Sequence, residues 1–133
     1  MDGQNKDLYL SRGKVVDTAG NVLDGWAVGY LFLFGGDAYI WSADGSGTAY
    51  QVAPDTVGRC TGAADADGRR IFEGDILHYW DGETDVPYLC LWQDNGWRVK
   101  QMDLDASDDL DAPFCADARV VGSVHDNPEE AEQ

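Results

Sequence analysis

Two carboxylates spaced two residues apart, Glu73 and Asp75, are the residues of this sequence that come nearest to acid–base chemistry. A general acid and its partner base must share one face of a cleft, in surroundings that separate their pKa values. Alternate residues of a strand do share a face. Glu-Gly-Asp at the entrance of a strand also has a structural interpretation, because Gly74 permits an unusual backbone angle and Asp75 can accept hydrogen bonds from nearby amides. We favour the structural interpretation and expect no catalytic residue.

Patterns for metal binding are incomplete. The segment Asp65–Gly68 resembles part of a calcium loop, but Ala63 and Gly74 occupy positions where an EF-hand requires acids. We therefore predict a turn, in which the Asp-Gly pair supplies a positive φ angle. The two histidines, His78 and His125, have no further ligands at a spacing that suits zinc. We expect no metal site.

Patterns for nucleophilic and nucleotide chemistry are also missing. Gly45–Gly47 lacks the Gly-x-Ser-x-Gly spacing of a hydrolase nucleophile. The sequence contains no phosphate-binding Gly-x-x-x-x-Gly-Lys and no dinucleotide fingerprint. Cys90 lies in an apolar run, which favours a small core residue over a nucleophile. We predict a protein that is not an enzyme and that binds no cofactor.

The strongest feature of the composition is a net charge of −16 over 133 residues. Residues 102–133 contain ten acids and a single base, Arg119. Such a surface repels phosphate backbones and anionic membranes, so we expect neither nucleic-acid nor membrane binding. The acidity has three explanations: solubility, a basic protein partner, or imitation of the charge pattern of a nucleic acid. The acids of this segment that we consider candidate partner contacts are Asp103, Asp105, Asp108, Asp109 and Asp111.

Cysteine usage and hydropathy favour a soluble cytoplasmic protein. Cys60, Cys90 and Cys115 are odd in number and form no Cys-x-x-Cys pair, which indicates a reducing compartment. The N-terminal residues MDGQNKDLYLSRGK lack the apolar stretch of a signal peptide. The longest apolar run, Trp26–Phe34, is too short to span a bilayer as a helix.

The elements that must position these residues are short strands. Five Trp, six Tyr and sixteen Gly, with turn signals about every ten residues, favour seven or eight strands in an all-β sandwich or small barrel. The run Trp26–Phe34 predicts a buried strand with apolar residues on both faces. Asn95-Gly96 between two apolar runs predicts a hairpin. We expect loops at 81–87 and 103–118.

Three tryptophans of the second half could line an aromatic groove of the kind that binds peptides. We assign Trp92 and Trp97 to the core, because a barrel of this size needs large residues to fill it. Trp80 stands beside the polar loop that begins at Asp81, and it is the candidate for an exposed anchor. Trp80 and Asp81 therefore join the candidate partner contacts.

A central motif in two parts resembles that of a known family. The parts are Val52–Gly62, VAPDTVGRCTG, and Asp65–Ile76, DADGRRIFEGDI. This pattern closely resembles the YopX family of phage and prophage proteins. We interpret the motif positions as structural, and they are Pro54, Thr56, Gly58, Thr61, Gly62, Gly68, Glu73, Gly74 and Asp75.

The resemblance implies a single YopX-like chain over residues 1–133 with two parts. These are a small N-terminal β unit at about 12–53 and an SH3-like β-barrel at about 70–128. The resemblance also implies a phage or prophage origin, and it carries over no catalytic residue.

Three functions remain open. The favoured one is a phage- or prophage-encoded accessory protein, without enzymatic activity, that binds a host or phage protein. The second is a self-assembling accessory protein, in which the apolar strand Trp26–Phe34 forms the interface of a homo-oligomer. The third is an acidic mimic of nucleic acid that blocks a DNA-binding protein of the host.

Overall fold

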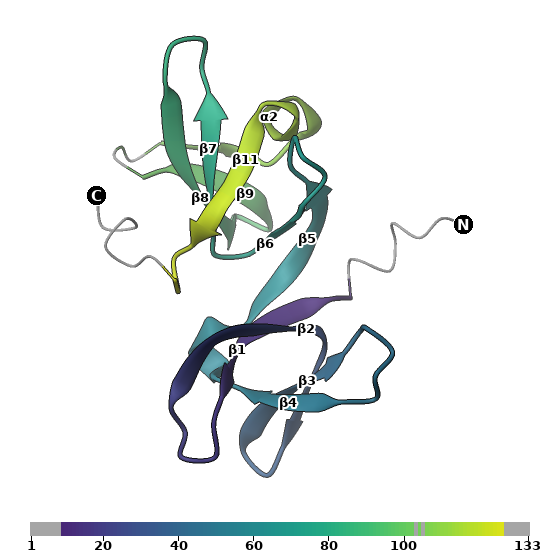
Figure 1. Ribbon diagram of the computed structural model, residues 1–133. Coiled ribbons are helices and arrows are strands. Elements are labelled where there is room, and N and C mark those ends of the chain that lie inside the picture. Colours follow the sequence, from purple (N-terminus) through teal and green to yellow (C-terminus); the bar gives the residue numbers. More distant parts are fainter. Residues whose placement is uncertain (1–8, 103, 105, 127–133) are drawn as a thin grey trace. The chain divides into compact units, whose positions relative to one another are not determined.

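Short antiparallel strands make up most of the chain, as the aromatic and glycine-rich composition predicts. The computed structural model describes residues 9–102, 104 and 106–126. The chain forms two compact units, Met1–Cys60 and Thr61–Gln133, whose strands can be followed in Figure 1. The all-β class is confirmed, and the described residues hold eleven strands rather than seven or eight. The SH3-like barrel stays a prediction.

Four strands of the N-terminal unit close into a ring of antiparallel pairs. They are β1 (Ser11–Val16), β2 (Val22–Phe34), β3 (Asp37–Ser42) and β4 (Ala49–Val52). The long strand β2 pairs with β1 along its first part and with β3 along its second part, and β4 pairs with both β3 and β1. After β4 come the 3₁₀ helix η1 (Pro54–Thr56) and strand β5 (Gly58–Ala64), whose first residues pair with β1.

Two glycines allow these strands to approach one another. Gly29 is the residue at which β2 passes from pairing with β1 to pairing with β3. A Cβ atom at Gly29 would overlap the carbonyl oxygen of Trp41. A Cβ atom at Gly13 would lie 2.9 Å from the Cβ of Val52, closer than side chains normally pack. The ring of strands therefore requires glycine at both positions.

The N-terminal unit has a small core and leaves much of β2 exposed. The buried cluster consists of Ala27, Ala38, Ile40 and Val52. The prediction that Trp26–Phe34 is buried on both faces is wrong, because Tyr30–Phe34 is exposed, with Leu33 and Phe34 exposed by 75% and 73%. The physical reason is size: the four strands enclose one small interior, and β2 continues beyond Gly29, where its pairing with β1 ends.

The C-terminal unit contains a five-stranded antiparallel sheet in the order β10-β9-β8-β7-β11. Figure 1 labels β7, β8, β9 and β11 of this sheet. Its strands are β7 (Asp75–Trp80), β8 (Asp85–Gln93), β9 (Gly96–Gln101), β10 (Ser107–Asp109) and β11 (Ala118–Ser123). Strand β6 (Arg70–Phe72) lies next to β5, and the short helix α2 (Ala112–Ala116) precedes β11. The core consists of Ile71, Leu77, Cys90, Val99, Phe114, Cys115, Ala118 and Val120. In the part of the chain that the structure describes, no helix is long and apolar enough to cross a bilayer.

The β8–β9 hairpin is confirmed, but its turn is centred one residue earlier than expected. Gln93 pairs with Gly96, and the positive φ angles belong to Asp94 (55°) and Asn95 (63°). A type I′ turn needs two such residues at its centre. Asp-Asn therefore fills the places in which Asn-Gly was expected.

Two segments expected to be loops contain regular structure. Strand β8 begins at Asp85, so the loop expected at 81–87 ends at residue 84. The acidic segment 103–118 includes both β10 and α2. The helix starts because the Asp111 carboxylate accepts a hydrogen bond from the Phe114 amide at 3.0 Å, with Pro113 in the first turn. A capping acid and a proline thus begin a helix in a segment whose average composition favours a loop.

Candidate functional site

The carboxylate of Asp75 is part of the core. The residue is wholly buried, and its Oδ2 accepts a hydrogen bond of 2.7 Å from the Phe72 amide. Gly74 adopts φ 91°, and its amide donates to the Cys90 carbonyl. Glu73 is half-buried in the turn between β6 and β7. These hydrogen bonds join β6, β7 and β8. Because no solvent reaches Asp75, a substrate has no access to its carboxylate.

The hydroxyl groups of the two threonines of the family motif form hydrogen bonds with backbone groups. The Thr56 hydroxyl donates to the Ala53 carbonyl at 2.7 Å and accepts from the Lys14 amide at 2.9 Å. The Thr61 hydroxyl donates to the Ile71 carbonyl at 2.8 Å. These contacts fasten η1 to β1 and β5 to β6. The other motif positions also have backbone roles, with Pro54 beginning η1, Gly58 buried, Gly62 at φ 85° and Gly68 at φ 84°.

Asp65 has a larger structural role than its sequence context indicates. It is almost fully buried, and its Oδ1 accepts hydrogen bonds from the amides of Asp67 and Arg69, each at 2.9 Å. Its Oδ2 accepts a third from the amide of Val120, at 2.9 Å. The turn at 65–68 was predicted, whereas the bond to β11 leaves no signal in the sequence. Among the residues that the structure describes, no three His, Cys, Asp or Glu side chains are grouped as metal ligands.

The tryptophans of the C-terminal unit differ from one another in exposure. Trp80 is 51% exposed. Trp92 is 44% exposed, so its assignment to the core is wrong, while Trp97 is half-buried against the core. The two rings meet edge to face, with centroids 5.1 Å apart. Trp92 and Trp97 are cross-strand partners on the same face beside the hairpin turn, where Trp97 packs against the core and Trp92 is the more exposed of the two.

Asp81 organises the turn that follows Trp80. Its Oδ1 accepts hydrogen bonds from the amides of Glu83 at 2.8 Å and Thr84 at 2.9 Å. These two bonds, that of Thr84 first, lower the pKa of the Asp81 carboxyl below its ordinary value. The carboxylate stabilises the β7–β8 turn, which begins directly after Trp80, the last residue of β7.

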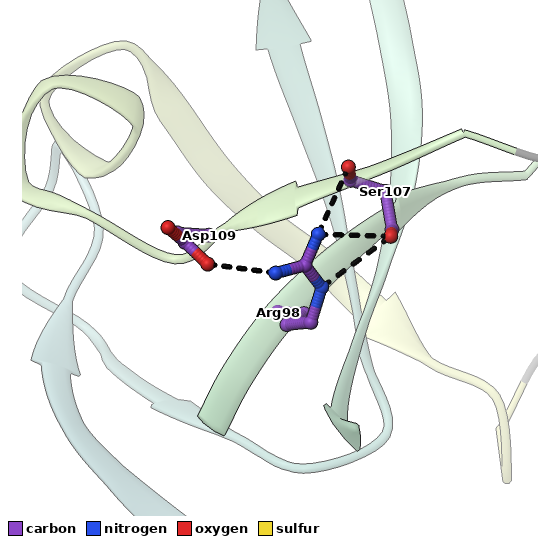
Figure 2. Close-up of polar contacts among 3 residues, drawn as sticks. All are labelled: Arg98, Ser107 and Asp109. Atoms are coloured by element: carbon purple, nitrogen blue, oxygen red, sulfur yellow. Dashed lines mark hydrogen bonds and ion pairs between the residues drawn. The ribbon is translucent and has the colours of Figure 1, made fainter. Parts of the chain in front are cut away.

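The acids of the 103–111 segment have different surroundings. Asp103 and Asp105 lie outside the described residues. Asp109 forms an ion pair with Arg98, with Nη1 and Oδ1 2.8 Å apart. The same guanidinium donates to the hydroxyl and carbonyl oxygens of Ser107, as Figure 2 shows. Arg98 thus fastens the short strand β10 to β9.

Strands β2 and β3 of the N-terminal unit carry a group of exposed aromatic residues. Opposite residues of paired strands share a face, and the register pairs Tyr30 with Trp41 and Phe32 with Tyr39. Phe34 follows on the same side of β2. We call this surface the aromatic face, and it consists of Tyr30, Phe32, Phe34, Tyr39 and Trp41. The opposite side of β3 carries Ala38 and Ile40 of the core.

The side chains of the aromatic face are open to solvent. Tyr30, Phe32, Phe34 and Trp41 are 39–73% exposed, and the ring of Phe32 stacks on that of Tyr39 with centroids 5.4 Å apart. The spacing Tyr30-x-Phe32-x-Phe34 could have revealed this face in the sequence. It was missed because Leu31 and Leu33 stand between the aromatic residues, so that no polar residue marks a solvent side.

Beside the aromatic face, strand β2 has an edge that no other described strand covers. Residues 30–34 of β2 pair with β3 on one side. On the other side, pairing with β1 stops at Gly29, and no other described strand takes its place. An open edge can pair with an added strand.

Comparison with known proteins supports the resemblance found in the sequence. A family model described as "YopX protein" matches residues 38–132. No curated protein matches the chain. A solved structure titled "Crystal structure of protein EF1440 from Enterococcus faecalis" is similar, with 21% sequence identity and a TM-score of 0.45, and the match covers 91% of this chain and 87% of that one.

Proposed function

The chain belongs to the YopX family, and on that premise we propose that it is a non-enzymatic accessory protein that binds another protein through its aromatic face. The proposal places it in the cytoplasm of a bacterial host, encoded by a phage or prophage. The observation that supports it is the exposure of Tyr30, Phe32, Phe34 and Trp41 on one side of β2 and β3.

The size of this surface favours a binding role. Each aromatic side chain can bury roughly 150–250 Å², so the exposed parts of these residues amount to an area on the order of 400 Å². An area of this order matches the largest apolar patch of a typical monomeric protein, roughly 300–600 Å², and that patch is often functional. Tyrosine and tryptophan are also the residues most enriched among interface residues that dominate binding energy.

The open edge of β2 adds a way to bind backbone. A partner strand laid along residues 30–34 would receive hydrogen bonds from the edge while its side chains met the aromatic face or the leucines between. Affinity would then come from both the main chain and the rings. The prominent carboxylates of the C-terminal unit support a non-enzymatic role, since Asp65 and Asp75 are buried and bonded to backbone amides.

A double variant tests the proposed face. In Phe34→Ser with Trp41→Ser, both changes lie at exposed sites of β2 and β3. The matched control is Leu104→Ser with Val121→Ser, at sites 58% and 45% exposed in the C-terminal unit. We expect affinity capture from host lysate, followed by mass spectrometry, to lose the partner with the face variant only. Circular dichroism checks that both variants fold. Retention of the same partner by the folded face variant would overturn the proposal.

Self-association is the second candidate, because the same open edge and apolar side could pair with a second copy. The net charge of −16 makes two copies repel each other, and added salt would screen this repulsion. Sedimentation of the wild-type chain at micromolar concentration separates the two candidates. A dimer that the Phe34→Ser/Trp41→Ser variant abolishes supports self-association, and a monomer at low and high salt excludes it.

A further inference from the structure

A cavity in the C-terminal unit combines aromatic rings with carboxylates. It has a volume of about 360 Å³ and lies between β7, β8, β10 and the start of α2. This volume falls toward the lower end of the range of roughly 300–1,000 Å³ found for small-ligand sites. We call it the tyrosine cavity, and its lining residues are Tyr79, Tyr88, Phe114, Pro113, Asp108, Asp109 and Asp111.

Three rings form the apolar part of the tyrosine cavity. Tyr79 stacks on Phe114 with centroids 4.9 Å apart and the planes 8° from parallel. Tyr88 stands edge-on to both, 5.0 Å from Phe114 and 6.1 Å from Tyr79, with its plane at 80° to each. Phe114 is buried, whereas both tyrosines are half-buried. A cation placed over the face of such a ring is attracted by the ring's quadrupole.

Three acids and no base line the same cavity. Asp108 is the cross-strand partner of the buried Val99, so it lies on the inner side of β10. Asp111 holds the Phe114 amide through Oδ1. Asp109 is paired with Arg98. Since Arg98 balances the charge of Asp109, the negative charge of Asp108 and Asp111 favours a cationic occupant.

The arrangement also distinguishes between kinds of cation. The three acids line one cavity, but among the described residues no three His, Cys, Asp or Glu side chains are grouped so that they could hold a metal ion, and a metal ion is therefore a poor match. A guanidinium is planar, can stack on a tyrosine ring and can form two parallel hydrogen bonds to a carboxylate. Within this unit, Arg98 forms an ion pair with the Asp109 carboxylate and donates to the Ser107 carbonyl (Figure 2). The cavity offers an arginine both rings and acids within one small volume.

We propose that the tyrosine cavity binds the guanidinium group of an arginine side chain from a basic segment of a partner protein. This inference goes beyond the function proposed above, because it concerns the other unit of the chain and does not depend on the aromatic face. It gives the acids that line the cavity, Asp108, Asp109 and Asp111, a specific role in recognition. A single arginine buries little area, so we expect a dissociation constant on the order of millimolar for the isolated side chain.

Titration of the ¹⁵N-labelled full chain with capped amino acids tests the proposal. The probes are N-acetyl-arginine methylamide, its lysine counterpart and the neutral norleucine counterpart. We expect saturable shift changes at Tyr79, Tyr88 and Asp108 with the arginine probe, weaker changes with lysine and none with norleucine. Equal responses to norleucine and arginine would overturn the proposal, as would arginine-induced changes spread over all acidic surfaces without saturation.

Two variants provide a matched comparison. Asp108→Asn removes one charge from the cavity, and Asp94→Asn removes one charge from the distant β8–β9 turn. Asp108 and Asp94 are both exposed. We expect Asp108→Asn to weaken arginine binding roughly fivefold and Asp94→Asn to leave it unchanged. If the two variants weaken arginine binding equally, the loss reflects the net charge of the protein and contradicts a specific site at the cavity. Tyr88→Phe, which keeps the ring, should retain binding.

Discussion

Asp65 shows how a single carboxylate can join distant parts of the C-terminal unit. Its two oxygens accept hydrogen bonds from three backbone amides, two within its own turn and one on β11. The residue is 6% exposed. Removing a buried acceptor leaves its donors without partners and without water, which costs more than the bonds themselves contribute. The stability of this unit therefore depends strongly on one side chain that does no chemistry.

We expect Asp65→Ala to lower the free energy of unfolding by about 3–4 kcal/mol. Asp65→Asn should also be destabilising, because an amide has one acceptor oxygen and cannot accept from both the turn amides and the Val120 amide. The control is Asp67→Ala in the same turn, which removes only an exposed ion pair with Arg119 and should cost less than about 1 kcal/mol. Urea denaturation followed by circular dichroism measures both. Similar losses for the two alanine variants would show that the buried bonds matter little.

The turn carboxylate of Asp81 gives a prediction about pH. Hydrogen bonds from Thr84 and Glu83 favour its charged form, so the pKa is lowered from the ordinary 3.8. Such a group stabilises the fold above the unfolded-state pKa, and this contribution disappears as pH falls through the lower, folded-state pKa. Carboxyl NMR titration should place the Asp81 pKa below 3.8 in the folded chain and return it to that value in urea. An unshifted pKa in the folded chain would contradict the turn geometry.

At the scale of elements, the N-terminal unit depends on the way β2 is shared. One strand of 13 residues serves two neighbours, and Gly29 is the residue at which the partner changes. The space there is limited by backbone, since a Cβ would overlap the Trp41 carbonyl oxygen. Backbone cannot move aside as a flexible side chain can, so the position tolerates only glycine.

Gly29→Ala should destabilise the N-terminal unit by about 3 kcal/mol or unfold it. Gly25→Ala is the matched control, because it lies in the same strand and an added Cβ would meet no atom within 4 Å. Amide spectra of the two variants separate the effects: we expect the signals of β1, β2 and β3 to move or disappear only for Gly29→Ala. Wild-type spectra and stability for that variant would show that the close approach can relax.

At the scale of the whole molecule, sequence patterns predicted local features well. Hairpins such as β8–β9, the turn at 65–68 and the all-β class follow from turn residues and aromatic composition. Burial was harder to predict, because Leu31 and Leu33 between aromatic residues make both sides of β2 apolar. The capping of α2 by Asp111 was not predicted, because the many acids of the segment 103–118 made its overall composition favour a loop.

Contacts between distant segments left the least trace in the sequence. The bond from Asp65 to Val120 joins residues far apart in the chain. The tyrosine cavity likewise draws Tyr79, Tyr88 and Phe114 from three elements. No spacing rule connects such residues until the order of the strands in the sheet is known.

The ring of strands in the N-terminal unit also has a consequence for the order of folding. Strands β1, β2 and β3 are joined by tight turns, so their pairs form between neighbours in the chain. Closing the ring requires Val15 to meet Val52 across a much longer loop. Loop closure costs entropy that grows with loop length, and contacts between distant residues slow folding. The three-stranded meander should therefore assemble first, with the aromatic face complete on β2 and β3 before β4 closes the ring.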